Sequence, residues 1–277
     1  MTPRAGGAGP SPIPPGLDAQ LDDLVALGMT LAGHMTAKEV RFIAMVAALP
    51  TCAGDILEIG SYQGKSTIIL ARAAGLAGVG RVAAVDPLSV PASTDPRDVV
   101  PEELPAIFYG NLREHGVQDR VDFHQMTSAE LGPSWTRPLR FLWIDGDHTW
   151  DGARTDFDVF NGFLQPGAIV AFHDVLHRFE GPIRAMAERV LVSPMFGACG
   201  VSGSIGWGQY LGDAQLAAPF QAAKARLRDQ LLALLPLSRA ESPYSPLNEL
   251  LFKYHRARVP HGAVRAAAWA REVRFFR

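Results

Sequence analysis

Cysteine is scarce in this sequence, and two other features that would place it in a special class are absent. The 277 residues include two cysteines, Cys52 and Cys199, which are too few for a disulfide scaffold or a cysteine-based zinc site. No apolar run reaches the roughly 18 residues that a membrane span needs, so we expect no integral membrane segment. The first 16 residues contain no apolar stretch of the kind that a secretory signal requires. We therefore expect a disordered Pro/Gly tail at 1–16 and a cytoplasmic protein.

Charge is distributed unevenly along the chain. Residues 1–223 carry 15 basic and 24 acidic side chains, whereas residues 224–277 carry 11 basic and 4 acidic ones. A basic helical extension can contact an anionic membrane surface, a nucleic acid or the acidic body of its own protein, and composition does not separate these. The acidic body disfavours nucleic acid as a substrate, because it would repel phosphates.

Short apolar runs alternate with stretches of helical periodicity. Strands are predicted at 55–60, 81–86, 121–125, 141–144 and 168–172, with a closing hairpin at 198–211 that turns at Gly203 and Ser204. Helices are predicted at 65–74, 102–115, 149–164 and 182–192, and two more within 17–49. This alternation predicts parallel strands in a doubly wound α/β sheet with helices on both faces.

The pattern divides the chain into three parts. These are the tail at 1–16, a Rossmann-like α/β catalytic domain with N-terminal helices at 17–212, and a basic helical extension at 213–277. Helices are predicted in the extension at 214–235 and 247–276. A proline-rich, acidic loop at 87–105 follows the second strand at the edge where such sheets bind ligands, so it is a candidate lid.

The first motif that indicates chemistry follows the first predicted strand. It reads Glu58-Ile-Gly-Ser-Tyr-Gln-Gly-Lys-Ser-Thr67, and Asp86 ends the next strand. Gly60 and Gly64 permit a sharp turn and close approach of a ligand to the backbone, and an acid in the position of Asp86 can accept hydrogen bonds from ribose hydroxyls. The segment lacks the glycine spacing of the dinucleotide fingerprint and of the phosphate-binding P-loop. It predicts a nucleoside ligand.

The second motif places carboxylates and imidazoles at the ends of two neighbouring strands. Ile144-Asp-Gly-Asp-His148 ends one strand, and His173-Asp174 ends the next. Because adjacent strands lie about 4.8 Å apart, Asp145 and Asp174 can converge, and paired carboxylates repel unless a cation or a proton lies between them. Oxygen ligands favour Mg²⁺, and an added imidazole shifts the preference toward Mn²⁺. His148 is the candidate general base, since its ordinary pKa lies near 6.5.

The helix that follows this motif carries further acids, Asp151, Asp156 and Asp158. We expect these on its solvent face or in its first turn, outside the site. His177, in the loop after the second motif, has no partner that the sequence identifies.

These residues resemble the class I S-adenosylmethionine-dependent methyltransferases. Within that class, the sequence is similar to the metal-dependent small-molecule O-methyltransferases of macrolide, cephamycin and mycobacterial polysaccharide biosynthesis. LEIGSYQGKST resembles the first family motif and AAVDP the second, and FLWIDGDHTWDGARTDFDVFNGFLQPGAIVAFHDV carries the most specific similarity. The resemblance spans about Leu57 to Leu211 and implies a seven-stranded sheet whose last strand is antiparallel.

The resemblance also implies roles for individual residues. Gly60, Ser61 and Gly64 would line the methionine part of S-adenosylmethionine, Asp86 would hold its ribose and Ser128 would lie near its adenine. The remaining residues assigned to this cofactor are Glu58, Tyr62, Ser66 and Asp145. The implied metal ligands are Asp145, His173 and Asp174, with His173 in a position that is often acidic in relatives.

The resulting hypothesis is methyl transfer from S-adenosylmethionine to a hydroxyl of a small molecule or saccharide. Asp145 and a divalent metal, Mg²⁺ or Mn²⁺, would assist, and His148 would remove the proton. A homodimer through the N-terminal helices or the extension is a further hypothesis. Three rival functions are a metal-dependent hydrolase, which leaves the nucleoside motif unexplained, a nicotinamide oxidoreductase, which lacks its fingerprint glycines, and a cofactor-binding scaffold without turnover.

Overall fold

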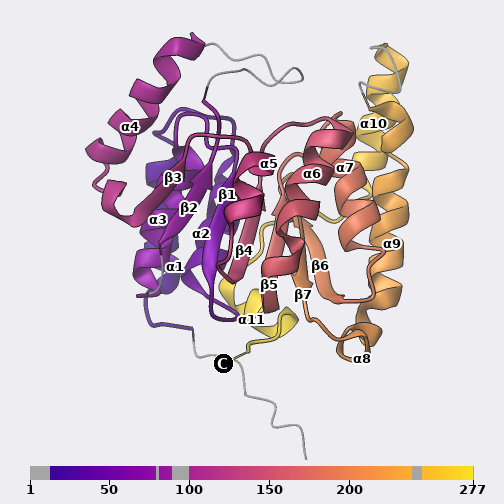
Figure 1. Ribbon diagram of the computed structural model, residues 1–277. Helices are drawn as coiled ribbons and strands as arrows, with labels where there is room; N and C mark the ends of the chain where they lie inside the picture. The colour runs from indigo at the N-terminus through magenta and orange to yellow at the C-terminus, as the bar shows by residue number, and fades with distance from the viewer. Residues whose placement is uncertain (1–12, 79–80, 89–99, 239–244, 277) are drawn as a thin grey trace, which may run out of the picture.

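A mixed β-sheet forms the centre of the computed structural model, which describes residues 13–78, 81–88, 100–238 and 245–276 (Figure 1). The strands are β1 (Asp55–Ile59), β2 (Val82–Val85), β3 (Val121–His124), β4 (Leu139–Ile144), β5 (Leu164–Phe172), β6 (Phe196–Ser202) and β7 (Ile205–Tyr210). The helices are α1 (Leu17–Gly28), α2 (Ala37–Ala48), α3 (Lys65–Leu76), α4 (Leu104–Glu114), α5 (Ser128–Leu131), α6 (Trp150–Phe160), α7 (Glu180–Ala185), α8 (Ala214–Ala217), α9 (Gln221–Leu232), α10 (Pro246–Ala257) and α11 (Ala266–Glu272).

The strand order confirms the predicted doubly wound, seven-stranded sheet. The order is β3-β2-β1-β4-β5-β7-β6, and β1 to β5 are parallel wherever they pair. β7 runs antiparallel to both β5 and β6, and its hairpin with β6 turns at the predicted Gly203 and Ser204. The winding order of the strands reverses between β1 and β4, and sheets of this kind bind ligands at the carboxyl ends of the strands beside such a point.

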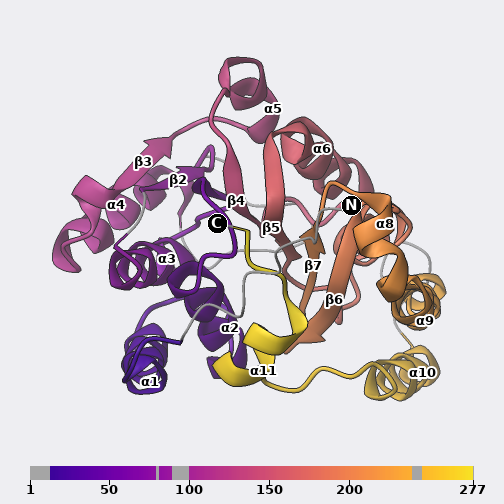
Figure 2. The same ribbon diagram turned by 90° about the horizontal axis from the view of Figure 1, so that it is seen from below.

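Alternate residues of each strand point to opposite faces of the sheet, and both faces are buried. Phe141 and Trp143 of β4 join the core with α1, α2, α3, α4 and α11, whereas Leu142 and Ile144 join the core with α5, α6 and α7. Seen from below, α5 and α6 lie on one side of the sheet and α1, α2, α3 and α11 on the other (Figure 2). The strands therefore read as nearly continuous apolar runs rather than as alternating ones.

The helices of the C-terminal extension are shorter than predicted. The helix expected at 247–276 is interrupted between α10 and α11, where Pro260 has no N–H to donate and Gly262 adds flexibility to the backbone. The helix expected at 214–235 is likewise divided by a 3₁₀ turn that contains Pro219. Each proline interrupts a helix that the apolar periodicity predicts as continuous.

The end of the extension packs into the core beside the sheet. Trp269 of α11 is fully buried, and its ring centroid lies 4.8 Å from that of Trp207 in β7 and 5.7 Å from that of Phe42 in α2. After α11, the buried side chain of Gln209 in β7 donates to Arg274 O (2.6 Å) and to Gly167 O (3.1 Å), and accepts from Arg274 N (2.8 Å). The end of the chain is therefore bonded to the sheet.

Replacing Gln209 with leucine is expected to lower the free energy of unfolding by about 2 kcal/mol or more. The change leaves the amide and carbonyl of Arg274 without their partner, and an unsatisfied buried group costs about 1–3 kcal/mol. Urea unfolding measures this loss, and Gln215→Leu, at an exposed position on α8, is the matched control. Equal stability of the two variants would contradict the role given to Gln209.

Two predictions concern segments outside the described residues. Residues 1–12 of the expected tail and residues 89–99 of the candidate lid are not described, so both predictions stay open. None of the described helices has the length and apolar character needed to cross a membrane.

Candidate active site

The site lies where β1, β4 and β5 end side by side. Ile59 pairs with Ile144, and Ile144 pairs with Phe172, so the residues that follow them leave the sheet at the same level. These following residues are Gly60, Asp145 and His173. Strand register alone therefore brings the two sequence motifs together, as predicted.

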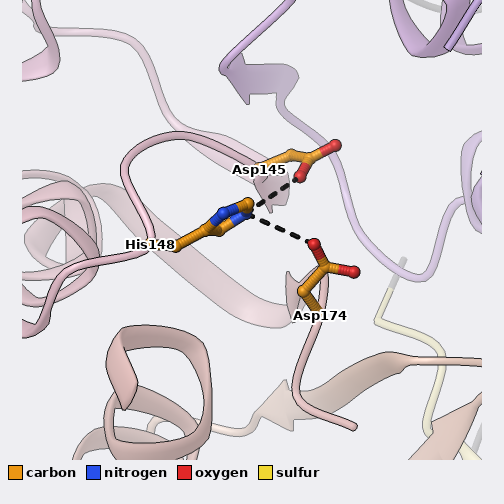
Figure 3. A group of neighbouring side chains, drawn as sticks. All are labelled: Asp145, His148 and Asp174. Atoms are coloured by element: carbon orange, nitrogen blue, oxygen red, sulfur yellow. Dashed lines mark ion pairs between the residues drawn. The ribbon is translucent and has the colours of Figure 1, made fainter. Parts of the chain in front are cut away.

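Asp145, His148 and Asp174 point toward one another from three positions at this edge (Figure 3). His148 Nε2 lies 3.4 Å from Asp174 Oδ2 and 3.9 Å from Asp145 Oδ1. Each residue offers one potential metal-ligand atom, and these three atoms lie within 4.8 Å of one another. Among the described residues, this is the group of side chains that could hold a metal ion. We call these three residues the Asp/His/Asp cluster.

His148 is held in place by packing. Its ring stacks on Phe179, with centroids 4.3 Å apart and planes 19° apart, and neither buried ring nitrogen has a hydrogen-bond partner within the described part of the chain. Burial lowers the pKa of His148, but the carboxylates of Asp145 and Asp174 outweigh burial and leave the pKa raised. The ring thus has a fixed orientation and a free nitrogen that faces two anions.

His173 lies beside the Asp/His/Asp cluster and contacts both of its carboxylates, and its predicted role as a metal ligand with Asp145 and Asp174 stays a prediction. Its Nδ1 is 3.1 Å from Asp145 Oδ1 and 3.2 Å from Asp174 Oδ1, and its Nε2 faces Glu39 Oε2 of α2 at 3.6 Å. The two-residue period of β5 accounts for this placement, since it directs His173 to the α2 face of the sheet. Burial disfavours the charged imidazole, but the surrounding carboxylates raise the pKa of His173 well above its ordinary value.

The loop after β1 has a backbone that requires glycine. Gly60 has φ 87°, and a Cβ there would lie 2.1 Å from the carbonyl oxygen of Asp145. Gly64, with φ 90°, caps the N-terminus of α3. Close contact between the β1–α3 loop and the residue after β4 therefore depends on the absence of a side chain at residue 60.

Asp86 fixes this loop from the end of β2. Its Oδ2 accepts the backbone N–H groups of Ser61 (2.8 Å) and Tyr62 (2.9 Å), and its Oδ1 accepts that of Leu88 (2.7 Å). Sequence reasoning assigned Asp86 to the ribose alone. In the structure three backbone N–H groups use most of its acceptor capacity, and Oδ1 has one lone pair left over.

Glu58 of β1 is hydrogen-bonded to the same loop and to the first turn of α3. Its side chain is fully buried and accepts hydrogen bonds from Ser61 Oγ (3.0 Å) and Thr67 Oγ1 (2.5 Å). Burial raises the pKa of Glu58 to about 7. Glu58, predicted to contact the cofactor, has no exposed surface and contacts the loop instead, whereas Ser66 lines the pocket directly.

Ser128 lies after β3, and its hydroxyl donates to Asp156 Oδ1 of α6 at 2.5 Å. The expectation that Asp156 faces solvent is wrong, because its side chain is buried against the 145–147 loop, whereas Asp151 and Asp158 are at the surface. Burial raises the pKa of Asp156 to about 7. The helical period alone did not show that α6 turns this acid toward the sheet edge.

A pocket joins these features. Its walls are the α1–α2 link (residues 32–35), the β1–α3 loop with Lys65 and Ser66, and the Asp/His/Asp cluster with His173. Lys65 Nζ donates to the carbonyl oxygens of Gly33 and Met35, both at 3.2 Å, and so anchors the link to α3. The N-terminal helices are therefore part of the site.

Sequence reasoning missed three residues that contact the cluster or its neighbours. Phe179 stacks on His148, His177 Nδ1 lies 2.8 Å from Asp174 Oδ1, and Glu39 faces His173. The spacing of His177, three residues after Asp174, was an available signal. Thr36 and Glu39 form a capping box, which the sequence also shows, but that pattern predicts a helix start rather than a site.

Residues 57–175 match a family model described as a methyltransferase domain. Among solved structures, the chain is similar to CalS11, described as a calicheamicin methyltransferase, with a TM-score of 0.51 and 16% identity over 76% of this chain and 100% of that one. It is also similar to an O-methyltransferase from Bacillus cereus (TM-score 0.49, 22% identity, 72% and 93% of the two chains). A third similar structure is cofactor-bound Rv0187 from MTB (TM-score 0.49, 21% identity, 73% and 99%). At these identities, the likeness to CalS11 shows the fold.

Proposed function

We propose that the chain is a class I S-adenosylmethionine-dependent methyltransferase and that it transfers the methyl group to a hydroxyl of a small molecule or saccharide. The observation that carries the proposal is the Asp/His/Asp cluster beside the β1–α3 loop. A hydroxyl is a weak nucleophile until it loses its proton, and this cluster offers both a proton acceptor and a place for a cation. The description of CalS11 as a calicheamicin methyltransferase supports a natural-product acceptor.

We assign the cofactor to the loops at the ends of β1, β2 and β3. Gly60, Ser61, Tyr62 and Ser66 line the pocket, which supports their contact with the methionine part of S-adenosylmethionine. The free lone pair of Asp86 Oδ1 supports a ribose contact, and the position of Ser128 after β3 supports one to adenine. Gly64 contributes through the turn that opens α3.

The residues present fit a divalent metal. Two carboxylates and an imidazole converge, and both nitrogens of His148 are buried without a hydrogen-bond partner in the described residues. Asp145 and Asp174 would hold the ion, which we propose to be Mg²⁺ or Mn²⁺. When bound, such a cation stabilises negative charge that develops on the acceptor oxygen.

His148 Nε2 can either bind an ion or accept a proton, but not both at once. We assign it the proton, because Asp145 and Asp174 already provide two anionic ligands and the imidazole faces them with a free nitrogen. His148 accepts the hydroxyl proton as the oxygen–carbon bond forms and the carbon–sulfur bond of the sulfonium breaks. Asp174 then stabilises the imidazolium, and the β1–α3 loop keeps the methyl donor in line with the acceptor.

Three further parts of the proposal concern the partners and the location. We propose a small-molecule acceptor rather than nucleic acid because of the acidic excess of residues 1–223, and a location in the cytoplasm. We also propose a homodimer. One face of α10 carries four exposed large hydrophobic side chains, those of Leu247, Leu250, Leu251 and Tyr254, and this supports a dimer contact there. Light scattering tests the dimer by measuring the mass of the protein in solution.

Titration with S-adenosylhomocysteine by calorimetry tests the cofactor assignment. We expect micromolar binding by the wild type and at least tenfold weaker binding by Asp86→Asn, because the new amide group cannot accept all the bonds that Asp86 accepts. Asp55→Asn, at the opposite end of β1, is the matched control and should bind as the wild type does. Absence of binding by the wild type would remove the methyltransferase proposal and favour a hydrolase or a scaffold.

A further inference from the structure

A carboxylate from outside the methyltransferase domain lies directly behind the Asp/His/Asp cluster. Glu39 belongs to the first turn of α2, whereas the family match begins at residue 57. The residue is 3% exposed, although glutamate is almost never fully buried unless it is paired. The metal hypothesis does not use it, so its burial requires an explanation of its own.

The contacts of Glu39 fix its carboxylate in one position. Oε1 accepts the N–H and the hydroxyl of Ser204 in the β6–β7 turn, both at 2.7 Å. Oε2 accepts the N–H (2.7 Å) and the hydroxyl (2.8 Å) of Thr36. The turn is fitted to this side chain, because a Cβ at Gly203 would lie 2.7 Å from Glu39 Cγ.

Held in this way, Glu39 faces the one edge of His173 that points away from the cluster. Its Oε2 is 3.6 Å from His173 Nε2, while His173 Nδ1 lies within 3.2 Å of Oδ1 of both Asp145 and Asp174. His173 Nε2 is buried and has no hydrogen-bond partner within the described residues other than this approach to Glu39. The carboxylate of Glu39 therefore orients the ring of His173 from one side, and the ring in turn orients the carboxylates of Asp145 and Asp174 on the other side.

We propose that Glu39 is a positioning residue for Asp145 and Asp174, acting through His173. Loss of its negative charge leaves the ring of His173 free to turn, and the two carboxylates then lose the shared donor that sets their separation. Residues that orient metal ligands typically change metal affinity about 10- to 100-fold when they are mutated. The inference rests on the proposed function, because it takes the cluster to be a metal site.

Glu39 also caps α2 and bonds the β6–β7 turn, so the test must separate positioning from stability. Glu39→Gln removes the charge that faces His173 and keeps a side chain that can still bond Ser204. Thr36→Ala removes the hydroxyl of the capping box, while the backbone N–H of residue 36 still bonds Glu39 Oε2 and keeps it opposite His173. A purely structural role predicts similar effects of the two variants, whereas a positioning role predicts an effect of the first alone.

The measurement is Mn²⁺ binding by the full chain, followed by calorimetry, with S-adenosylhomocysteine affinity and thermal unfolding as parallel readouts. We expect Glu39→Gln to bind Mn²⁺ at least tenfold more weakly than the wild type and to bind S-adenosylhomocysteine within twofold of it. Thr36→Ala should match the wild type in both affinities. If Glu39→Gln does not fold, Glu39→Asp takes its place in the test. Aspartate keeps the charge but is one methylene shorter, so its carboxylate lies farther from His173, and we expect it to weaken Mn²⁺ binding as well.

Three results would overturn the inference. They are unchanged Mn²⁺ affinity in the folded Glu39 variants, an equal loss in Thr36→Ala, and no Mn²⁺ binding by the wild type. In each case, retained binding of S-adenosylhomocysteine would leave the methyltransferase assignment standing. Loss of that binding in the wild type would instead remove the proposed function.

Discussion

Turnover is expected to fall by roughly a hundredfold to a thousandfold when Asp174 is replaced with asparagine, and Mn²⁺ binding is expected to be lost. Asp174 is the most heavily used carboxylate of the cluster. Its Oδ1 lies 2.8 Å from His177 Nδ1 and 3.2 Å from His173 Nδ1, and its Oδ2 lies 3.4 Å from His148 Nε2. Burial opposes ionisation, but these imidazoles hold the pKa of Asp174 well below its ordinary value, so the group is an anion throughout the neutral range.

Asparagine is the informative substitution because it preserves the backbone. Asp174 has φ 63°, a left-handed conformation that asparagine adopts nearly as readily as aspartate, whereas alanine would add strain. The amide is also close in size to the carboxylate, so the variant removes charge and changes little else. Thermal unfolding should then confirm that the variant is folded.

His148→Gln is the matched control for the division of roles within the cluster. If His148 accepts the proton, this variant loses turnover by about a hundredfold yet binds Mn²⁺ as the wild type does. If it loses Mn²⁺ binding to the same degree as Asp174→Asn, His148 is a metal ligand and another group takes the proton. Full activity of Asp174→Asn after exhaustive chelation would remove the metal from the mechanism.

The arrangement of the sheet could be predicted because it depends on local signals. Apolar runs that end in Gly60, Asp86 and Asp145 marked the carboxyl ends of parallel strands, and strand adjacency then brought Asp145 near Asp174. The choice between His148 and His173 as the third member of the cluster could not be predicted. That choice depends on which face of the sheet each ring enters, and hence on the packing of α2 and Phe179.

The contacts of Glu39 and Asp156 show a second reason why sequence reasoning was incomplete. Each lies on a helix whose polar residues are mostly at the surface, so its residue type predicts exposure. Each accepts a hydrogen bond from a hydroxyl in a distant part of the chain, Ser204 for Glu39 and Ser128 for Asp156, which offsets part of the cost of burial. Such long-range pairs have no periodic signature, and a single sequence does not contain them in readable form.

The burial of Asp156 has a consequence for stability that pH should reveal. Burial raises the pKa of Asp156 from an ordinary value of 3.8 to about 7, so between these values the folded chain holds a proton that the unfolded chain has lost. Because the unfolded state then binds fewer protons than the native state, the free energy of unfolding falls as pH rises across this window. About three pKa units at about 1.4 kcal/mol each correspond to a loss of about 4 kcal/mol from this one group.

Asp156→Asn is expected to remove that loss. The amide does not titrate and its oxygen can still accept the hydroxyl of Ser128, so the decline in stability between pH 5 and pH 8 should become smaller by up to about 3 kcal/mol. Urea unfolding at four pH values measures the slope, and Asp158→Asn, at the surface of the same helix beside Arg189, should keep the wild-type slope. The fully buried Glu58 and the raised pKa values of His148 and His173 act in the same direction and remain in both variants. The difference between the two slopes therefore reports the charge state of Asp156 alone, and equal slopes would mean that Asp156 is already ionised in the folded protein at pH 5.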